Sequence, residues 1–302
     1  MKNFIYLDYN ATTPTDLRVA EAMTPYLTGF FGNPSSGHHL GREAKAAVER
    51  ARAQVASCLG SEPDEIVFTS GGSESDNLAL RGVVSARGGG HVITSAIEHP
   101  AVLEVALAME MEGLIELTVV GVDDHGRIDP EDVSAALRKD TVLVSVMLAN
   151  NEVGTLQPVT EIASRCRGRG VLVHTDAAQA VGKIPVDVEA LGVDLLTVAG
   201  HKLYAPKGIG ALYIRSGVEI EPQIRGAGHE RRLRAGTENI LEMVGLGAAS
   251  ALVRDEPARE YERIASLRDR LRRRLAELRQ RPVRVQHRRR LRGVPVVQPR
   301  EL

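Results

Sequence analysis

Short apolar runs and segments with helical spacing of apolar residues alternate along most of the chain. The runs have the length of strands and are rich in β-prone residues; they cover residues 66–69, 115–120, 142–148, 170–173, 193–198 and 209–214. Between them, residues 42–59 and 130–137 place apolar side chains at the period of an α-helix. This alternation predicts an α/β protein with a mostly parallel, doubly wound sheet and helices on both of its faces.

A long charged segment with helical spacing, residues 256–279, follows the last of these runs. We interpret it as the passage from a large domain into a smaller one, an interpretation that is compatible with an ordinary solvated helix face. The predicted large domain covers residues 13–253, and the predicted small domain combines residues 1–12 with residues 254–302.

Two apolar runs lead directly into residues that carry chemistry. The run at 170–173 is followed by Asp176, and the run at 193–198 is followed by Lys202. Open α/β sheets bind their ligands at the carboxyl ends of their strands. An acid that keeps a ring nitrogen protonated and a lysine that attacks an aldehyde are what pyridoxal 5'-phosphate (PLP) chemistry requires. Taken alone, however, the two residues are more typical of an ion pair between loops.

A glycine-rich turn at residues 70–77 connects the run at 66–69 to a segment with helical spacing. Free backbone N–H groups and the helix dipole at such a turn favour a phosphate. The turn is not a Walker loop, because no Gly-Lys-Ser/Thr follows, and it is not a nucleophile elbow, because the closing glycine is absent. By itself the turn fits an ordinary helix N-cap as well.

Composition narrows the class of protein mainly by exclusion. The chain has 302 residues, 43% of them hydrophobic, and a formal net charge of −1, which gives no bias toward nucleic acid or an anionic membrane. No apolar stretch approaches the roughly 20 residues of a transmembrane helix, and the N-terminus lacks a signal-peptide pattern. We therefore expect a cytoplasmic protein. Cys58 and Cys166 fall in helix-patterned segments, which predicts buried apolar residues rather than a disulfide.

Further motifs occur in one uninterrupted order between about residue 4 and about residue 275. They are YLDYNATTP at 6–14, FGNPSS at 31–36, EHP at 98–100, NNEVG at 150–154 and RAGTEN at 234–239. Together with the turn and the segments around Asp176 and Lys202, they resemble the cysteine desulfurases of the NifS/IscS type within the class V aminotransferases. The resemblance implies the PLP-dependent transferase fold of the aspartate aminotransferase type, with a seven-stranded sheet, and a homodimer.

The resemblance also assigns roles around the PLP ring. Lys202 would bind the cofactor covalently and then move the substrate Cα proton, and Asp176 would keep the ring nitrogen protonated. Gln179 would donate a hydrogen bond to the ring hydroxyl oxygen, with Asn151 near the same oxygen and the substrate carboxylate. His99 would stack on the ring face; outside its Glu-His-Pro context it would be an ordinary loop histidine.

For the phosphate, the resemblance implies Gly72, Ser73 and His201 on one subunit and Thr237 from a second subunit. Ala199 stands where relatives commonly carry a serine, three residues before the lysine. A lost hydrogen bond to a charged group costs about 1.5–3 kcal/mol. We therefore expect weaker retention of PLP than in those relatives.

Residues 281–302 are crowded with arginine and proline and show no periodicity. They do not resemble the family, whose members continue with a loop carrying a nucleophilic cysteine and with an arginine for the substrate carboxylate. Cys58 and Cys166 stand outside any matching motif, so the persulfide-forming cysteine loop is missing from this chain. We expect a frame shift or truncation near residue 281; the alternative, a basic arm for nucleic acid, lacks interleaved aromatic residues.

The resemblance implies an enzyme that converts L-cysteine to L-alanine and transfers the sulfur for iron–sulfur cluster or thiocofactor synthesis. Its partners would be a second copy of the chain and a sulfur-acceptor or scaffold protein, with no metal, nucleic acid or membrane. Two alternatives stay open: a selenocysteine lyase or other β-eliminating PLP enzyme of the same fold, and a non-catalytic fragment that binds PLP.

Overall fold

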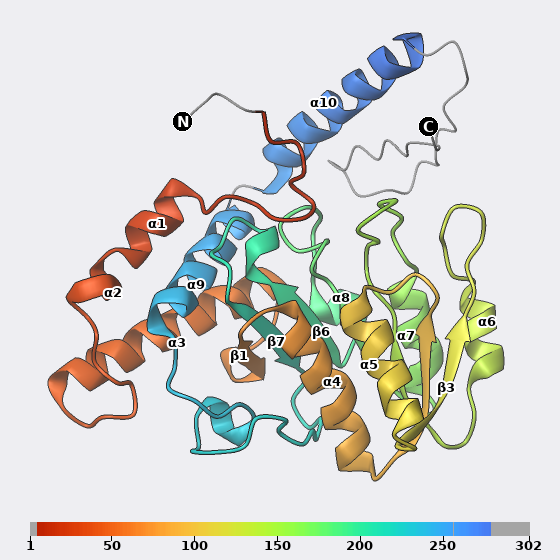
Figure 1. Ribbon diagram of the computed structural model, residues 1–302, viewed down its shortest axis with the longest axis horizontal. Helices are drawn as coiled ribbons and strands as arrows, with labels where there is room; N and C mark the ends of the chain where they lie inside the picture. Colours follow the sequence, from red (N-terminus) through yellow and green to blue (C-terminus); the bar gives the residue numbers. More distant parts are fainter. Residues whose placement is uncertain (1–4, 256, 279–302) are drawn as a thin grey trace.

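One seven-stranded sheet forms the centre of the computed structural model, which describes residues 5–255 and 257–278 (Figure 1). The strands are β1 Ile66–Thr69, β2 Gly90–Ser95, β3 Ile115–Val120, β4 Thr141–Ser145, β5 Leu172–Asp176, β6 Leu195–Ala199 and β7 Gly210–Ile214. Their order across the sheet is β1-β7-β6-β5-β4-β2-β3. Strands β2 to β6 pair in parallel, whereas β7 is antiparallel to both of its neighbours. The predicted mostly parallel sheet is confirmed.

The strands other than β7 all end at the same edge of the sheet. Gly210, the first residue of β7, pairs with both Thr69 and Ala199, the last residues of β1 and β6. Asp176, the last residue of β5, pairs with Thr197 of β6. Because parallel neighbours end side by side, the segments that follow β1, β5 and β6 converge at this edge.

Helices cover both faces of the sheet (Figure 1). Their bounds are α1 Leu17–Met23, α2 Pro25–Thr28, α3 His39–Leu59, α4 Gly72–Arg87, α5 Pro100–Met111, α6 Pro130–Ala136, α7 Val159–Arg167, α8 Val188–Leu191, α9 Ile240–Asp255 and α10 Pro257–Leu278. Successive strand residues point to opposite faces, so Ile66 and Phe68 join one apolar cluster and Val67 joins the other. The first cluster includes residues of α1, α3, α6, α7, α8 and α9, and the second includes residues of α4 and α5.

One predicted run is longer than the strand it contains. The run at 142–148 includes β4, which ends at Ser145. Beyond that point the backbone N–H of Leu148 still donates to the carbonyl oxygen of Asp176, with an N–O distance of 2.9 Å. The segment after β4 therefore stays beside β5. The other predicted runs coincide or overlap with β1, β3, β5, β6 and β7.

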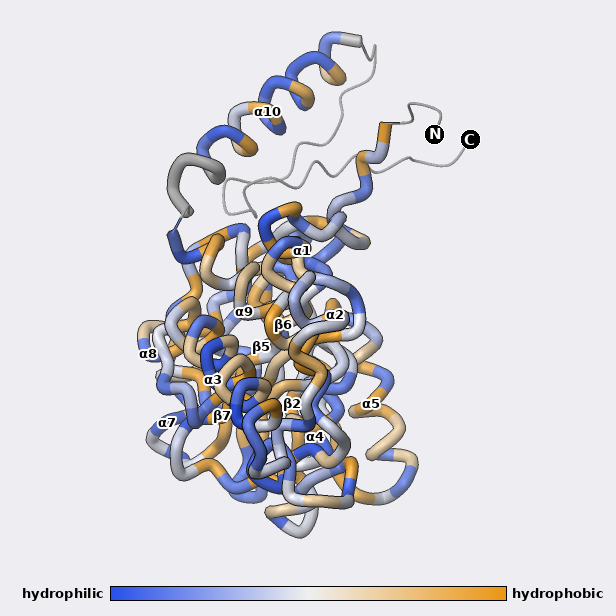
Figure 2. Tube along the Cα trace, turned by 90° about the vertical axis from the view of Figure 1, so that its left-hand side faces the viewer, coloured by the Kyte–Doolittle hydropathy of each residue, from blue (hydrophilic) through white to orange (hydrophobic). Residues whose placement is uncertain are grey.

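Helix α10 extends away from the sheet and its covering helices (Figures 1 and 2). It confirms the helix predicted at 256–279, although Glu256 and Arg279 lie outside the described residues. Figure 2 shows it as mainly hydrophilic with recurring hydrophobic positions. No helix among the described residues is both long and apolar enough to cross a membrane. The division into domains stays a prediction, and residues 281–302, with their expected frame shift, lie outside the described residues.

Both cysteines are free thiols on helices, as predicted. Cys166, on α7, is buried. Cys58 is only partly buried, so the prediction that both thiols are buried is wrong for this residue. The reason is its place near the end of α3, where Cys58 packs at the edge of the apolar cluster rather than inside it.

Candidate active site

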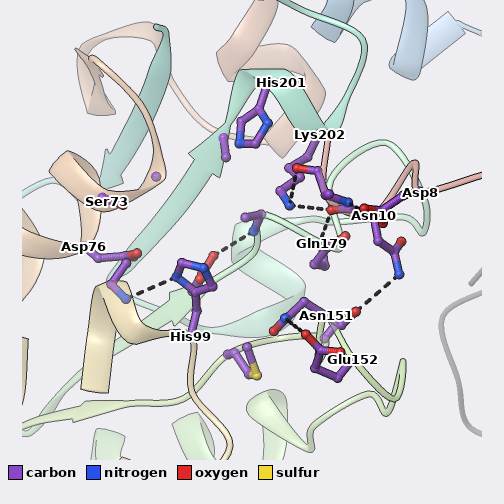
Figure 3. Close-up of a pocket in the computed structure, with 18 residues that line it drawn as sticks. Asp8, Asn10, Ser73, Asp76, His99, Asn151, Glu152, Gln179, His201 and Lys202 are labelled. Atoms are coloured by element: carbon purple, nitrogen blue, oxygen red, sulfur yellow. Dashed lines mark hydrogen bonds between the residues drawn. The ribbon is translucent and has the colours of Figure 1, made fainter. Parts of the chain in front are cut away.

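A cavity of about 730 Å³ opens at the edge of the sheet where the parallel strands end (Figure 3). All but one of the predicted site residues line it: Gly72, Ser73, His99, Asn151, Asp176, Gln179, His201 and Lys202. The exception is Thr237, which is exposed and is not part of the cavity wall. The wall also contains polar residues that were not predicted: Asp8, Asn10, Asp76 and Glu152.

Lys202 lies in a short 3₁₀ turn that directly follows β6. Its Nζ donates a hydrogen bond to the carbonyl oxygen of Ala11 at 3.0 Å and another to the carbonyl oxygen of Asn10. Partial burial lowers the pKa of Lys202, while the carboxylates of Asp176 and Asp8 act in the opposite direction. A lowered pKa leaves a larger share of the amine unprotonated, which is the form that attacks carbonyl carbons and accepts protons.

Asp176 is buried at the end of β5. Its Oδ1 accepts a hydrogen bond from the backbone N–H of Ala178 at 2.8 Å. Burial raises the pKa of Asp176, and that hydrogen bond together with His99 and Lys202 acts against the increase. A buried carboxylate is strongly stabilised by an adjacent cation, so this residue favours a protonated group of a ligand in the cavity.

His99 is the N-cap residue of α5. Its Nδ1 accepts the backbone N–H of Ala101 at 3.1 Å. In a neutral ring, Nδ1 is therefore the acceptor and Nε2 carries the hydrogen. The cap fixes the ring at the cavity wall, where it is exposed to a ligand (Figure 3).

Helix α4 begins at the cavity with Gly71 and Gly72, and steric constraints favour glycine at both positions. Gly71 has a φ of 151°, a backbone conformation that favours glycine. A Cβ added to Gly72 would lie 3.3 Å from the Cβ of Ala199, which is tighter than ordinary contact. The first N–H groups of a helix lack intrahelical acceptors, so this turn can bind an anion. His201 lines the same cavity, and its Nδ1 and the Thr12 hydroxyl are 3.2 Å apart.

Asn10 joins three of the predicted residues, although sequence analysis gave it no role. Its carbonyl oxygen accepts hydrogen bonds from Gln179 Nε2, at 3.0 Å, and from Lys202 Nζ. Its side-chain amide donates to the carbonyl oxygen of Asn151 at 3.2 Å. These partners are 141 to 192 residues away in sequence, so no local pattern could have identified the contact.

Asp76 is the second residue that sequence analysis missed. It lies on α4, is buried, and its Oδ1 has no hydrogen-bond partner within the described part of the chain. His174 Nε2 is 3.6 Å from that oxygen. Burial and then the charge of Asp176 raise the pKa of Asp76 well above its ordinary value. We interpret Asp76 as the protonated member of this carboxyl pair, which leaves the negative charge on Asp176.

The family model described as "Aminotransferase class-V" matches residues 5–298. The chain belongs to the class V aminotransferases. This match extends beyond residue 275, whereas the curated relatives described below align with the chain over 271 and 278 residues.

Curated members of the class V aminotransferases similar to this chain are named cysteine desulfurases. The chain is 51% identical over 271 residues to the cysteine desulfurase IscS of Dictyoglomus turgidum, covering 89% of this chain and 68% of that protein. It is 50% identical over 278 residues to the cysteine desulfurase IscS of Cronobacter sakazakii, covering 90% of this chain and 69% of that protein. The predicted resemblance to cysteine desulfurases is confirmed.

Solved structures of the class V aminotransferase type superimpose on most of the chain. A NifS-like protein has a TM-score of 0.88 and 41% identity, over 91% of this chain and 76% of that one. SspA in complex with cysteine has a TM-score of 0.82 and 38% identity, over 89% of this chain and 78% of that one. The predicted fold class is therefore confirmed.

Proposed function

We propose that this class V aminotransferase binds PLP in the cavity and acts on L-cysteine as a desulfurase that releases L-alanine. One observation carries the proposal: Lys202, Asp176 and the start of α4 at Gly72 line the same cavity, where β6, β5 and β1 end at one edge of the sheet. Similar proteins named cysteine desulfurase, and the structure of SspA in complex with cysteine, support it.

The residues on the cavity wall fit the chemical groups of PLP. The start of α4, with Gly72 and Ser73, suits the phosphate. Asp176 suits a protonated ring nitrogen, and Lys202 suits the aldehyde carbon. The volume of about 730 Å³ lies within the roughly 300–1,000 Å³ that is usual for small-molecule pockets.

When bound, PLP supplies an electron sink that stabilises negative charge on the substrate Cα. Lys202 removes the Cα proton, because burial lowers its pKa and makes the amine available as a base. Asp176 holds a proton on the ring nitrogen, because its buried charge favours a cation beside it. Gln179 and Asn151 orient the bound molecules, since both side chains lie on the cavity wall.

Sulfur transfer needs an acceptor thiol. The Cβ–S bond of cysteine breaks, the sulfur bonds to the acceptor as a persulfide, and the Cβ takes a proton to give alanine. Burial raises the pKa of Cys58 and of Cys166 to about 11 in each case, and neither residue lines the cavity. A protonated thiol is a poor nucleophile. We infer that an external thiol accepts the sulfur in this chain.

The absence of both Cys58 and Cys166 from the cavity wall also favours a second candidate function. A selenocysteine lyase or another β-eliminating PLP enzyme of this fold releases its product without a persulfide on its own cysteine. If the protein turned over neither L-cysteine nor L-selenocysteine, the third candidate would remain: a non-catalytic fragment that binds PLP. The chain spans 68% and 69% of the two curated relatives described above.

The proposal includes a homodimer in which Thr237 reaches the phosphate site of the second subunit. The exposure of Thr237, outside the cavity of its own chain, supports this part. A sulfur-acceptor or iron–sulfur scaffold protein is the proposed partner, as the name IscS of the relatives suggests. The cytoplasmic location stays a prediction.

The test is to incubate the PLP-loaded protein with L-cysteine or L-selenocysteine and an external dithiol, and to measure alanine, sulfide and selenide. We expect alanine and sulfide in equal amounts, with the dithiol oxidised to its disulfide, and neither product from Lys202→Ala. Selenide without sulfide would favour the lyase, and PLP binding without any product would favour the non-catalytic fragment. Mass spectrometry showing one added sulfur per chain on Cys58 or Cys166, formed as fast as alanine, would contradict the external acceptor.

A further inference from the structure

Lys183 contacts a predicted cofactor residue without lining the cavity itself. Its Nζ donates a hydrogen bond to Oε1 of Gln179, four residues earlier. The backbone N–H groups of Lys183 and Ile184 both donate to the carbonyl oxygen of Ala180, with N–O distances of 2.9 and 3.0 Å. These bonds close a tight turn that contains Gly182, with a φ of 81°, and this turn brings the side chains of Gln179 and Lys183 into contact.

The contact determines which way the Gln179 amide faces. A lysine ammonium group only donates hydrogen bonds, so the atom of Gln179 that faces Lys183 must be the carbonyl oxygen. The amide nitrogen, Nε2, then lies on the other side, where one N–H donates to the carbonyl oxygen of Asn10 at 3.0 Å. Its second N–H is left for a ligand in the cavity that Gln179 lines.

We propose that Lys183 is a positioning residue that fixes the Gln179 amide with its donor side toward the cavity, so that this wall binds an oxygen carrying lone pairs or negative charge. The role rests on the proposed function, in which that oxygen is the ring hydroxyl oxygen of PLP. With the amide reversed, a carbonyl oxygen would face the ligand oxygen and repel it. Without Lys183, only the carbonyl oxygen of Asn10, which accepts from Nε2, would favour this orientation, because the two ends of the amide are nearly equal in shape.

The surroundings of Lys183 are consistent with this role. Its side chain is half-buried, and desolvation together with the charge of Lys202 lowers the pKa of Lys183 to about 7. The protonated amine can only donate to Oε1, whereas the neutral amine can also accept, so Lys183 orients the amide most strictly in its protonated form. Gln179 and Lys202 share the carbonyl oxygen of Asn10 as acceptor, so the amide that Lys183 orients also lies beside the amine proposed to bind PLP.

A double-mutant cycle tests the proposal through the dissociation constant for PLP, measured by absorption. We expect Lys183→Met to raise that constant about tenfold, the size of one hydrogen bond to a charged or polarised oxygen. In a Gln179→Ala background the same substitution should change it by less than about twofold, because the amide through which Lys183 acts is gone. Lys207→Met, which removes a nearby exposed lysine, is the matched control and should leave the constant within about twofold.

A purely structural or electrostatic role would give equal effects in both backgrounds, and that result would overturn the proposal. An unchanged dissociation constant in Lys183→Met would overturn it as well. If Lys183→Met does not fold, two other variants are compared: Lys183→Arg, whose side chain only donates hydrogen bonds, and Lys183→Gln, whose side chain can donate or accept. The Lys183→Arg variant should bind PLP several-fold more tightly than the Lys183→Gln variant. Equal affinities of the two variants would contradict the role. Failure of the unmodified chain to bind PLP would instead overturn the proposed function, and this role with it.

Discussion

Glu98 holds two loops of the candidate site together, because its Oε1 accepts the backbone N–H of Met147 at 2.9 Å. Glu98 directly precedes His99, and Met147 lies on the segment that leads to Asn151. The Glu98 carboxyl group is buried and has the Ser95 hydroxyl as a further partner, 2.5 Å away. Two parts of the cavity wall that are distant in sequence therefore depend on one buried acid.

Glu98→Gln should change how stability depends on pH. Burial raises the pKa of Glu98 from 4.5 to about 8, so between these values the folded state binds more protons than the unfolded state. This contribution to stability is present below pH 4.5 and is lost as pH rises through about 8, by up to about 1.4 kcal/mol per pH unit. Urea unfolding across this range should give a flatter profile for Glu98→Gln, which keeps an acceptor for Met147. Parallel profiles for the two proteins would contradict the prediction.

Lys202→Ala should abolish covalent attachment of PLP. The unmodified protein should gain an absorption band in the visible or near ultraviolet when PLP is added, and borohydride should then fix PLP on Lys202, located by peptide mass spectrometry. Lys207→Ala is the control and should behave like the unmodified protein. Label on Lys207 or Lys183 in place of Lys202 would show that the assignment is wrong.

Asp176→Asn should keep PLP bound but slow exchange of the substrate Cα hydrogen by several orders of magnitude. A neutral amide cannot hold the proton on the ring nitrogen, and each factor of ten corresponds to about 1.36 kcal/mol of barrier. Hydrogen exchange into L-cysteine or L-alanine, followed by NMR, measures this rate. Asp140→Asn, at an exposed aspartate outside the cavity wall, is the control. An exchange rate that Asp176→Asn leaves intact would refute the role.

Ala199→Ser should tighten PLP binding, because it adds a hydroxyl donor beside the start of α4, where Ala199 lines the cavity. One hydrogen bond to a charged group corresponds to roughly tenfold to a hundredfold in the dissociation constant. Pyridoxal, which lacks the phosphate, is the matched control ligand, and its affinity should not change. Equal gains for both ligands would mean that residue 199 does not face the phosphate.

Arg52→Met should destabilise the fold strongly. Arg52 forms a buried bidentate ion pair with Glu230, with N–O distances of 2.7 and 2.9 Å. Removing one partner of a buried pair costs about 3–5 kcal/mol, because the other charge is left without compensation. Arg81→Met, which breaks the more exposed pair with Glu112, should cost at most about 1 kcal/mol. Urea unfolding measures both, and equal losses would contradict the role of burial.

Part of the site could be predicted because local sequence determines where strands end. Asp176 and the turn that holds Lys202 follow apolar runs, and the glycine-rich turn follows another. Once the sheet is parallel, strand ends must meet at one edge, so the grouping of these residues follows from their positions relative to the strands. The motifs in their order then indicated the family, which the comparisons confirm.

The sequence by itself predicted six of the seven strands, several of the helices, the edge of the sheet that carries the site and the family. The tertiary structure decided which polar groups complete that site: the carbonyl oxygen of Asn10, the buried acids Asp76 and Glu98, and the orientation of the Gln179 amide by Lys183. Strand and helix patterns repeat every two to four residues and can be read locally. Hydrogen bonds and desolvation depend on which distant segments the folded chain brings together, as between Asn10 and Lys202, 192 residues apart, and no local pattern contains that information.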